Sequence, residues 1–174
     1  PEMKDEPLPA NKKDYQKLLK KQEGYKLAEV KGKASSAFAS NWENKIIELG
    51  KNTFGWKSLK LNFGKKQVTM TVTETNGKSY ELPFGYQQWI TTTFDSYPPY
   101  SITPIDRFKG LEGPYYASGS YAWISKEELQ LKAHYVNWVS ALEITFHLEE
   151  NGEVKLNVQT NYIKKPYTIT GVIK

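Results

Sequence analysis

The sequence predicts an all-β protein, in which an antiparallel meander of about nine strands closes into a barrel or a sandwich behind one short helix. One observation is that apolar and polar residues alternate with a period of two from Lys45 onward. Another is that Asn76-Gly77 and Asn151-Gly152 each separate two alternating runs, as the turns of β-hairpins do. Almost no helical periodicity lies between the runs, which favours strands that follow one another directly.

The first element is a helix near the N-terminus. Asn11 is a good N-cap, and Tyr15, Leu18 and Leu19 follow with the i, i+3, i+4 spacing of a helix face. The stripe is narrow and its surroundings are rich in lysine, so we expect the helix to dock on a neighbouring surface. Binding to a membrane surface is the alternative, although neither Trp nor Phe accompanies the lysines.

Four strands are expected next, in the runs 45–49, 58–63, 68–73 and 80–84. Asn76-Gly77 predicts a type I′ turn between the last two, because both central residues of that turn need positive φ. A Pro-rich segment from Tyr86 to Tyr116 then interrupts the alternation and predicts a long ordered loop or lid. Five more strands are expected in the runs 115–124, 127–135, 141–150, 153–160 and 167–173.

Strand parity predicts which side chains face the interior, because alternate residues point to opposite faces. The expected interior residues are Leu59, Leu61, Phe63, Met70, Tyr80, Leu82, Leu131, Tyr135, Ile144, Phe146 and Leu156. The same parity places His134 and His147 on the outside. If their strands pair about Ser140-Ala141, the two histidines become cross-strand neighbours, but without a third ligand they do not form a typical metal site.

Charge and composition bound the domain organisation and the partners. Residues 1–33 carry 9 Lys against 6 acidic residues, so most of the formal charge of +5 belongs to this segment. We expect residues 1–33 to be a Pro/Lys-rich connector with the short helix, and residues 34–174 to be the barrel domain. Arg107 is the single arginine, which argues against nucleic-acid binding. Cysteine is absent and leaves the redox compartment open.

The chain begins at Pro1, which we interpret as a fragment or a processed form, and it contains no apolar run long enough for a signal peptide or a membrane span.

Recognisable catalytic motifs are missing. No serine has Lys three positions later, as penicillin-recognising serine enzymes require, and no nucleophile elbow, P-loop or dinucleotide fingerprint occurs. Tyr135-Val136-Asn137 matches the Tyr-x-Asn element of such enzymes, but the Ser-x-x-Lys nucleophile with which that element acts is missing.

Aromatic residues are the remaining candidates for a binding site. Trp123 with Tyr121, Tyr135 with Trp138, and Tyr86 with Trp89 lie where they would line a barrel mouth. The candidate ligand-binding residues are therefore Tyr86, Trp89, Trp123, Tyr135 and Trp138. Ordinary packing is the alternative, since small barrels fill their interior with side chains. No cofactor and no metal site are indicated.

The order of the motifs resembles a known family. "GYQQW" at 85–89, "ASGSYAW" at 117–123 and "ITG" at 169–171 are similar to phrases in the C-terminal domain of many β-lactamase-related serine hydrolases from Bacteroidetes and similar bacteria. The Pro-rich opening is similar to the connector and helix that lead out of the catalytic domain in that family. The spacing within "GYQQW" and the additional Ser120-Tyr121 pair depart from the family pattern.

The resemblance implies a lipocalin-like β-barrel of about eight to nine strands that lies beside a Ser-x-x-Lys active site and does not contain it. It implies a non-catalytic accessory domain, with the catalytic serine hydrolase domain of the parent chain as its partner and a periplasmic or secreted location. The alternative function is a stand-alone barrel that binds a small apolar ligand, and a hydrolase with an unrecognised site is a third hypothesis. Neither the substrate of the parent enzyme nor the oligomeric state follows from the sequence.

Overall fold

A computed structural model describes residues 11–95, 98, 113–138, 140–149, 151–161 and 164–174. Within them the chain forms an α-helix, α1 (Lys12–Glu23), a short 3-10 helix, η1 (Ala37–Asn41), and ten β-strands. The strands are β1 (Ile46–Leu49), β2 (Trp56–Phe63), β3 (Gln67–Glu74), β4 (Ser79–Tyr86), β5 (Ile90–Phe94), β6 (Tyr115–Trp123), β7 (Glu128–Tyr135), β8 (Ala141–Leu148), β9 (Glu153–Thr160) and β10 (Tyr167–Ile173).

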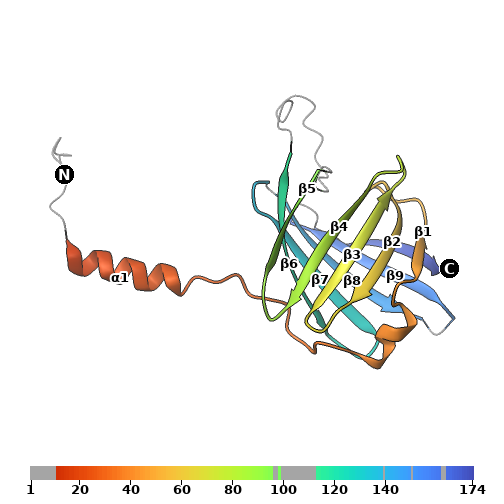
Figure 1. Ribbon diagram of the computed structural model, residues 1–174, viewed down its shortest axis with the longest axis horizontal. Helices are drawn as coiled ribbons and strands as arrows, with labels where there is room; N and C mark the ends of the chain where they lie inside the picture. Colours follow the sequence, from red (N-terminus) through yellow and green to blue (C-terminus); the bar gives the residue numbers. More distant parts are fainter. Residues whose placement is uncertain (1–10, 96–97, 99–112, 139, 150, 162–163) are drawn as a thin grey trace.

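The strands form a closed barrel, which confirms the predicted fold class (Figure 1). Neighbours follow the order β4-β3-β2-β1-β10-β9-β8-β7-β6-β5, and an additional pairing of β4 with β6 closes a ring of nine strands beside which β5 lies. All these ladders are antiparallel except β4–β6, which is parallel, so the sheet is mixed. The architecture is consistent with a lipocalin-like barrel. Strand β5 was not predicted, because its run Ile90–Phe94 falls inside the segment expected to be a loop.

The turn between β3 and β4 differs from the prediction. At the β3–β4 turn only Gly77 takes positive φ, +86°, while Asn76 does not. The Glu74 carbonyl accepts from Gly77 N–H at 3.0 Å, and Glu74 N–H donates to the Lys78 carbonyl at 2.8 Å. The predicted type I′ turn is therefore wrong: this is a three-residue loop whose last residue is a left-handed glycine. Asn76 contributes its side chain instead, accepting from Lys78 N–H at 2.8 Å.

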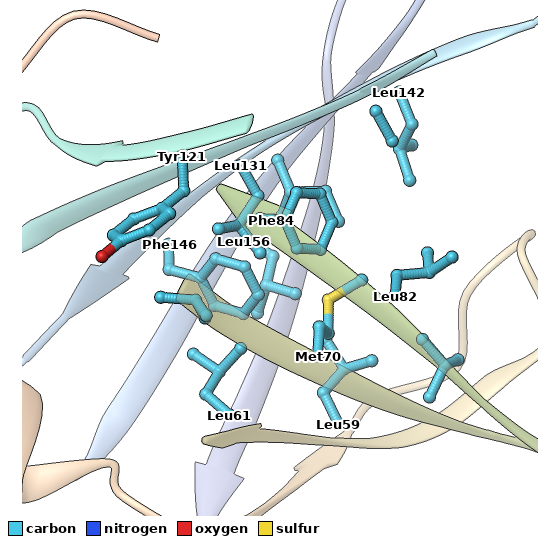
Figure 2. Close-up of a cluster of buried hydrophobic side chains, with 14 of the residues drawn as sticks. Leu59, Leu61, Met70, Leu82, Phe84, Tyr121, Leu131, Leu142, Phe146 and Leu156 are labelled. Atoms are coloured by element: carbon cyan, nitrogen blue, oxygen red, sulfur yellow. The ribbon is translucent and has the colours of Figure 1, made fainter. Parts of the chain in front are cut away.

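Bulky apolar side chains from all around the ring fill the barrel interior. Figure 2 shows leucines, Met70 and three aromatic residues from several strands pointing toward one another. All the predicted interior residues are buried except Phe63, which is half-buried and stacks on Trp123 with 5.9 Å between ring centroids. The interior is therefore a packed core, as expected for a small barrel.

Residues ahead of β1 close one end of the barrel. After η1, Trp42 is completely buried, and its ring lies 6.0 Å from that of Trp123 and 5.8 Å from that of Phe146. Asn44 N–H donates to the Leu61 carbonyl at 2.9 Å, which ties this segment to β2. We call this the plugged end, and the opposite end, where β2, β4, β6 and β8 begin, the mouth.

Helix α1 lies apart from the barrel (Figure 1). Its predicted N-cap is confirmed, because the Asn11 side chain accepts from Asp14 N–H at 3.1 Å. None of its residues is buried, and Tyr15 and Leu18 of the apolar stripe are 59% and 50% exposed. The stripe is therefore present, and two of its three residues are exposed within the described part of the chain.

Candidate functional site

The parallel pairing of β4 with β6 is the point at which the barrel closes. It consists of two residue pairs, Gly85 with Ser120 and Tyr86 with Tyr121. Glycines let the strands approach here: a Cβ on Gly119 would lie 2.8 Å from Cδ1 of Phe84. We call this contact the seam. It is the shortest ladder in the ring, since even β1 makes three pairs with each neighbour.

Residues 27–34, which we call the strap, lie against the seam. Val30 and Gly32 contact the outer face of β6, whereas the Ala34 carbonyl accepts from Tyr121, whose side chain points into the barrel. The strap is joined to β6 by a reciprocal pair of backbone hydrogen bonds between Lys33 and Trp123, each 2.9 Å long. Val30 of the strap is 6% exposed. The strap thus extends the packed structure of the barrel toward the N-terminus, well beyond η1.

Side chains of the barrel hold the strap by its backbone. Three donate to strap carbonyls: Trp89 Nε1 to Leu27 O at 3.0 Å, Tyr86 Oη to Gly32 O at 3.1 Å, and Tyr121 Oη to Ala34 O at 2.9 Å. A fourth, Ser120 Oγ, accepts from Val30 N–H at 3.3 Å. Burial, together with the neighbouring Tyr86, raises the pKa of Tyr121, so its hydroxyl remains a neutral donor over a wide pH range.

The outer face of β6 is shaped to receive the strap. Ser120 and Ala122 point outward by parity, yet both are 0% exposed. A Cβ on Gly32 would lie 3.0 Å from Cβ of Ala122 and 2.9 Å from the carbonyl carbon of Trp123, so the strap comes as close as a glycine allows. The small residues on an outward strand face are the sequence signal from which this contact could have been predicted.

Trp89 connects the strap to a histidine on β7. Its ring lies edge-on to His134 with 5.1 Å between centroids, and both side chains are outside the barrel. Partial burial, and to a lesser extent the nearby Lys132, lowers the pKa of His134. Protonation of this imidazole is therefore disfavoured in the folded state, beside one of the four side chains that hold the strap.

The mouth carries a separate aromatic cluster. Phe94 contacts three rings, Tyr80 at 5.4 Å, Tyr135 at 5.7 Å and Tyr115 at 6.0 Å, and Tyr115 packs against Trp138 at 5.5 Å. Burial raises the pKa of Tyr135 well above its ordinary value. The cluster is well packed and closes the interior from this side.

Three buried hydroxyl groups at the mouth have no hydrogen-bond partner among the residues that the structure describes. They belong to Tyr135, Ser140 and Thr160, whose exposed fractions are 3%, 4% and 2%. Tyr135 N–H donates to the Ser140 carbonyl at 3.1 Å, and Thr160 lies opposite Leu142 on the neighbouring strand, so all three belong to the same end of adjacent strands. A buried hydroxyl without a partner is costly, and a small polar group bound here would relieve that cost.

The five residues predicted to bind a ligand do not form one site. Tyr135 and Trp138 lie at the mouth, whereas Trp123 packs inside the plugged end against Trp42. Tyr86 and Trp89 use their polar atoms to hold the strap. The periodicity could not separate these places, because it does not tell which end of the barrel a residue occupies.

A hollow of about 580 Å³ lies where the strap leaves the barrel. Its lining residues are Gly32, Lys33, Ser35, Ser36, Ala37, Trp123, Ile124, Ser125 and Lys126. The Lys126 ammonium lies 5.2 Å from the ring centre of Phe38, and Ser36 Oγ donates to the Lys126 carbonyl at 2.6 Å. These contacts fix Ser36 and η1 against the β6–β7 turn.

The other residues singled out in the sequence have structural surroundings. His134 pairs with Ala141 and His147 with Glu128, so the histidines lie at opposite ends of the β7–β8 ladder and are not cross-strand neighbours. The Tyr-x-Asn element is divided: Tyr135 is buried, while Asn137 accepts from Tyr116 N–H and donates to the Pro114 carbonyl.

The described part of the chain contains no group of three or more His, Cys, Asp or Glu residues placed to hold a metal ion. Within the same residues, no helix combines the length and the apolar character needed to cross a bilayer. Comparison of the sequence with models of known protein families and with curated proteins found no match.

Proposed function

We propose that this chain is a non-catalytic accessory domain of a β-lactamase-related serine hydrolase, and that it packs on the catalytic domain or shapes access to it. The observation that carries the proposal is the apolar stripe of α1, which stands away from the barrel with Tyr15 and Leu18 exposed (Figure 1). An isolated helix of 12 residues is marginally stable in water, so packing on a second surface would stabilise it.

Two further features support the proposal. The motifs in the segments 85–89, 117–123 and 169–171 resemble the C-terminal domain of that hydrolase family. Apolar exposure also continues past α1 to Tyr25 and Leu27, which gives a second surface enough area to bury. The same resemblance is the basis for proposing a periplasmic or secreted bacterial location.

The test asks whether the chain is produced as part of a larger serine enzyme. An antibody raised against the barrel is used on extracts of the source cells, alongside a fluorescent penicillin and a fluorophosphonate probe. We expect the antibody to detect a polypeptide much longer than 174 residues that also reacts with a serine probe. A single unlabelled polypeptide of this chain's own length would overturn the proposal.

A matched pair of variants in that larger polypeptide tests the docking surface. Leu18→Glu places a charge in the apolar stripe and is expected to speed proteolytic cleavage between the two domains. Gln16→Glu adds the same charge to the same helix outside the stripe, and is expected to leave cleavage unchanged. Equal cleavage of both variants would exclude α1 as the docking element.

The second candidate function is a stand-alone barrel that binds a small apolar ligand. The observation that favours it is that, within the described part of the chain, the hydroxyl groups of Tyr135, Ser140 and Thr160 beside the aromatic rings of the mouth have no hydrogen-bond partner. A ligand with one polar group at the end of an apolar body would satisfy them. A dose-dependent rise in melting temperature with fatty acids or similar molecules, lost in Thr160→Val, would support this function over the accessory one.

A further inference from the structure

The strap is recognised through its backbone, which is how extended peptides are recognised by folded domains. Trp89, Tyr86 and Tyr121 donate to three of its carbonyls, Ser120 accepts from one of its N–H groups, and Trp123 exchanges two backbone hydrogen bonds with it. None of these hydrogen bonds involves a side chain of the strap. The groove formed by these five barrel residues therefore suits a peptide backbone in extended form.

Sequence selectivity comes from two positions of the strap. Val30 is buried, so a compact apolar side chain is required there. Gly32 lies so close to β6 that a Cβ would meet backbone atoms of Trp123 and the side chain of Ala122. A backbone carbonyl cannot rotate away as a flexible side chain can, so any other residue at this position must displace the strap.

Occupation of the groove also closes the barrel. The seam has only two residue pairs, and both include residues that hold the strap. Tyr86 pairs with Tyr121, and Ser120 pairs with Gly85. The strap bonds to both strands of the seam, because Tyr86 is on β4 and Tyr121 is on β6. An empty groove would leave these hydroxyls and the Trp123 backbone without these partners at the shortest ladder of the ring.

We propose that the groove over the β4–β6 seam is a docking site for an extended peptide with a Val-x-Gly motif, occupied in this chain by its own residues 27–34, and that its occupant locks the barrel. The site is independent of the function proposed above, since it requires no partner domain and no ligand in the mouth.

The first experiment measures hydrogen exchange in the complete chain. Gly32→Ala is compared with Gly24→Ala, because a Cβ at Gly24 would meet nothing closer than 3.4 Å. We expect Gly32→Ala to accelerate exchange of the seam amides in residues 84–87 and 119–123 by about tenfold or more, the factor that corresponds to about 1.4 kcal/mol of local stability. Gly24→Ala should match the unmodified chain. Seam exchange that is equal in all three proteins overturns the locking role.

The second experiment supplies the occupant from outside. A fluorescent peptide with the sequence of residues 27–34 is titrated into the Gly32→Ala chain and into the unmodified chain. We expect saturable binding to the variant, slowed seam exchange in the complex, and binding at least tenfold weaker to the unmodified chain, whose groove is occupied. A control peptide with alanine at the Gly32 position should not bind. Absence of binding to the variant, or equal binding of both peptides, overturns the docking site.

A further variant decides the question if Gly32→Ala does not fold. Tyr86→Phe combined with Tyr121→Phe removes two donors to the strap without adding bulk, and Tyr116→Phe changes an exposed tyrosine of the same strand as a control. Faster seam exchange in the double variant alone supports the lock. Identical exchange in the double variant and the control contradicts it.

Discussion

Phe146 is the sharpest test of whether the barrel interior is a packed core or a lined cavity. Its side chain is completely buried in the cluster that Figure 2 shows. It lies opposite Leu129 and Leu156 on the neighbouring strands, and its ring is 5.8 Å from that of Trp42. Phe146→Ala removes most of a large apolar side chain from a site with contacts on every side. A change of this kind costs about 3–5 kcal/mol, including the cavity that remains.

The same loss can be expressed as a change in melting temperature. For a chain of this length, each kcal/mol corresponds to roughly 2–4 °C, so Phe146→Ala should lower the melting temperature by about 6–20 °C. Urea unfolding followed by tryptophan fluorescence gives the free energy, and an unchanged m-value would show that the comparison is between equivalent states. Tyr116→Ala, at an exposed position of β6, is the control and should cost less than about 1 kcal/mol.

Two results would refute the reasoning. A loss below about 1.5 kcal/mol for Phe146→Ala would mean that the surroundings of the ring are loosely packed, unlike a protein core. A dose-dependent gain in stability of the unmodified chain with fatty acids would mean that the interior accepts a ligand, because a ligand stabilises the state that binds it.

Three other perturbations test particular contacts. His134→Gln should remove one contribution to the loss of stability in acid. The folded pKa of His134 lies below 6.5, so the free energy of unfolding falls as the pH drops from about 6.5 through the folded pKa. Urea unfolding between pH 7 and 5 should therefore show a free energy that depends less on pH in the variant. Asn52→Ala should cost about 1–3 kcal/mol, because this side chain donates to the carbonyls of Gly50 and Trp56 and accepts from two N–H groups. Asn62→Ala, on the surface, is the control, and an equal loss of stability in both variants would contradict a structural role for the Asn52 hydrogen bonds. Gly119→Ala should lower stability by about 1–3 kcal/mol by pushing Cβ into the backbone carbonyl of Pro83 and the ring of Phe84, and a neutral result in thermal unfolding would show that the seam has room to widen.

Strand periodicity predicted the barrel well because its residues alternate strictly between a packed interior and solvent. In β7, Leu129, Leu131, Ala133 and Tyr135 are all buried and the residues between them are not. In β6 the rule breaks down, because residues 119–123 are buried on both faces once the strap covers the outer one. A local pattern cannot report that a segment about 90 residues earlier in the chain lies on top of it.

The candidate site was less predictable than the fold for the same reason. Tyr86 and Trp89 were identified as aromatic residues of interest, but their partners are backbone carbonyls of Gly32 and Leu27, which carry no sequence signal. The turn at Asn76-Gly77 was placed correctly and given the wrong type, since Asn-Gly suits both a two-residue turn and the end of a three-residue loop. Loop length depends on where the flanking strands stop pairing, and here Glu74 and Lys78 pair last.

The order of strands in the ring has a consequence for how the chain folds. Strands β1 to β4 and β6 to β10 are two meanders whose neighbours are close in sequence, so each can form from local contacts. The ring closes only through two distant pairings, β1 with β10 and β4 with β6. Because Ile47 pairs with Ile173, one edge of the first meander remains unpaired on the ribosome until residues 171–173 have been synthesised and have left the exit tunnel.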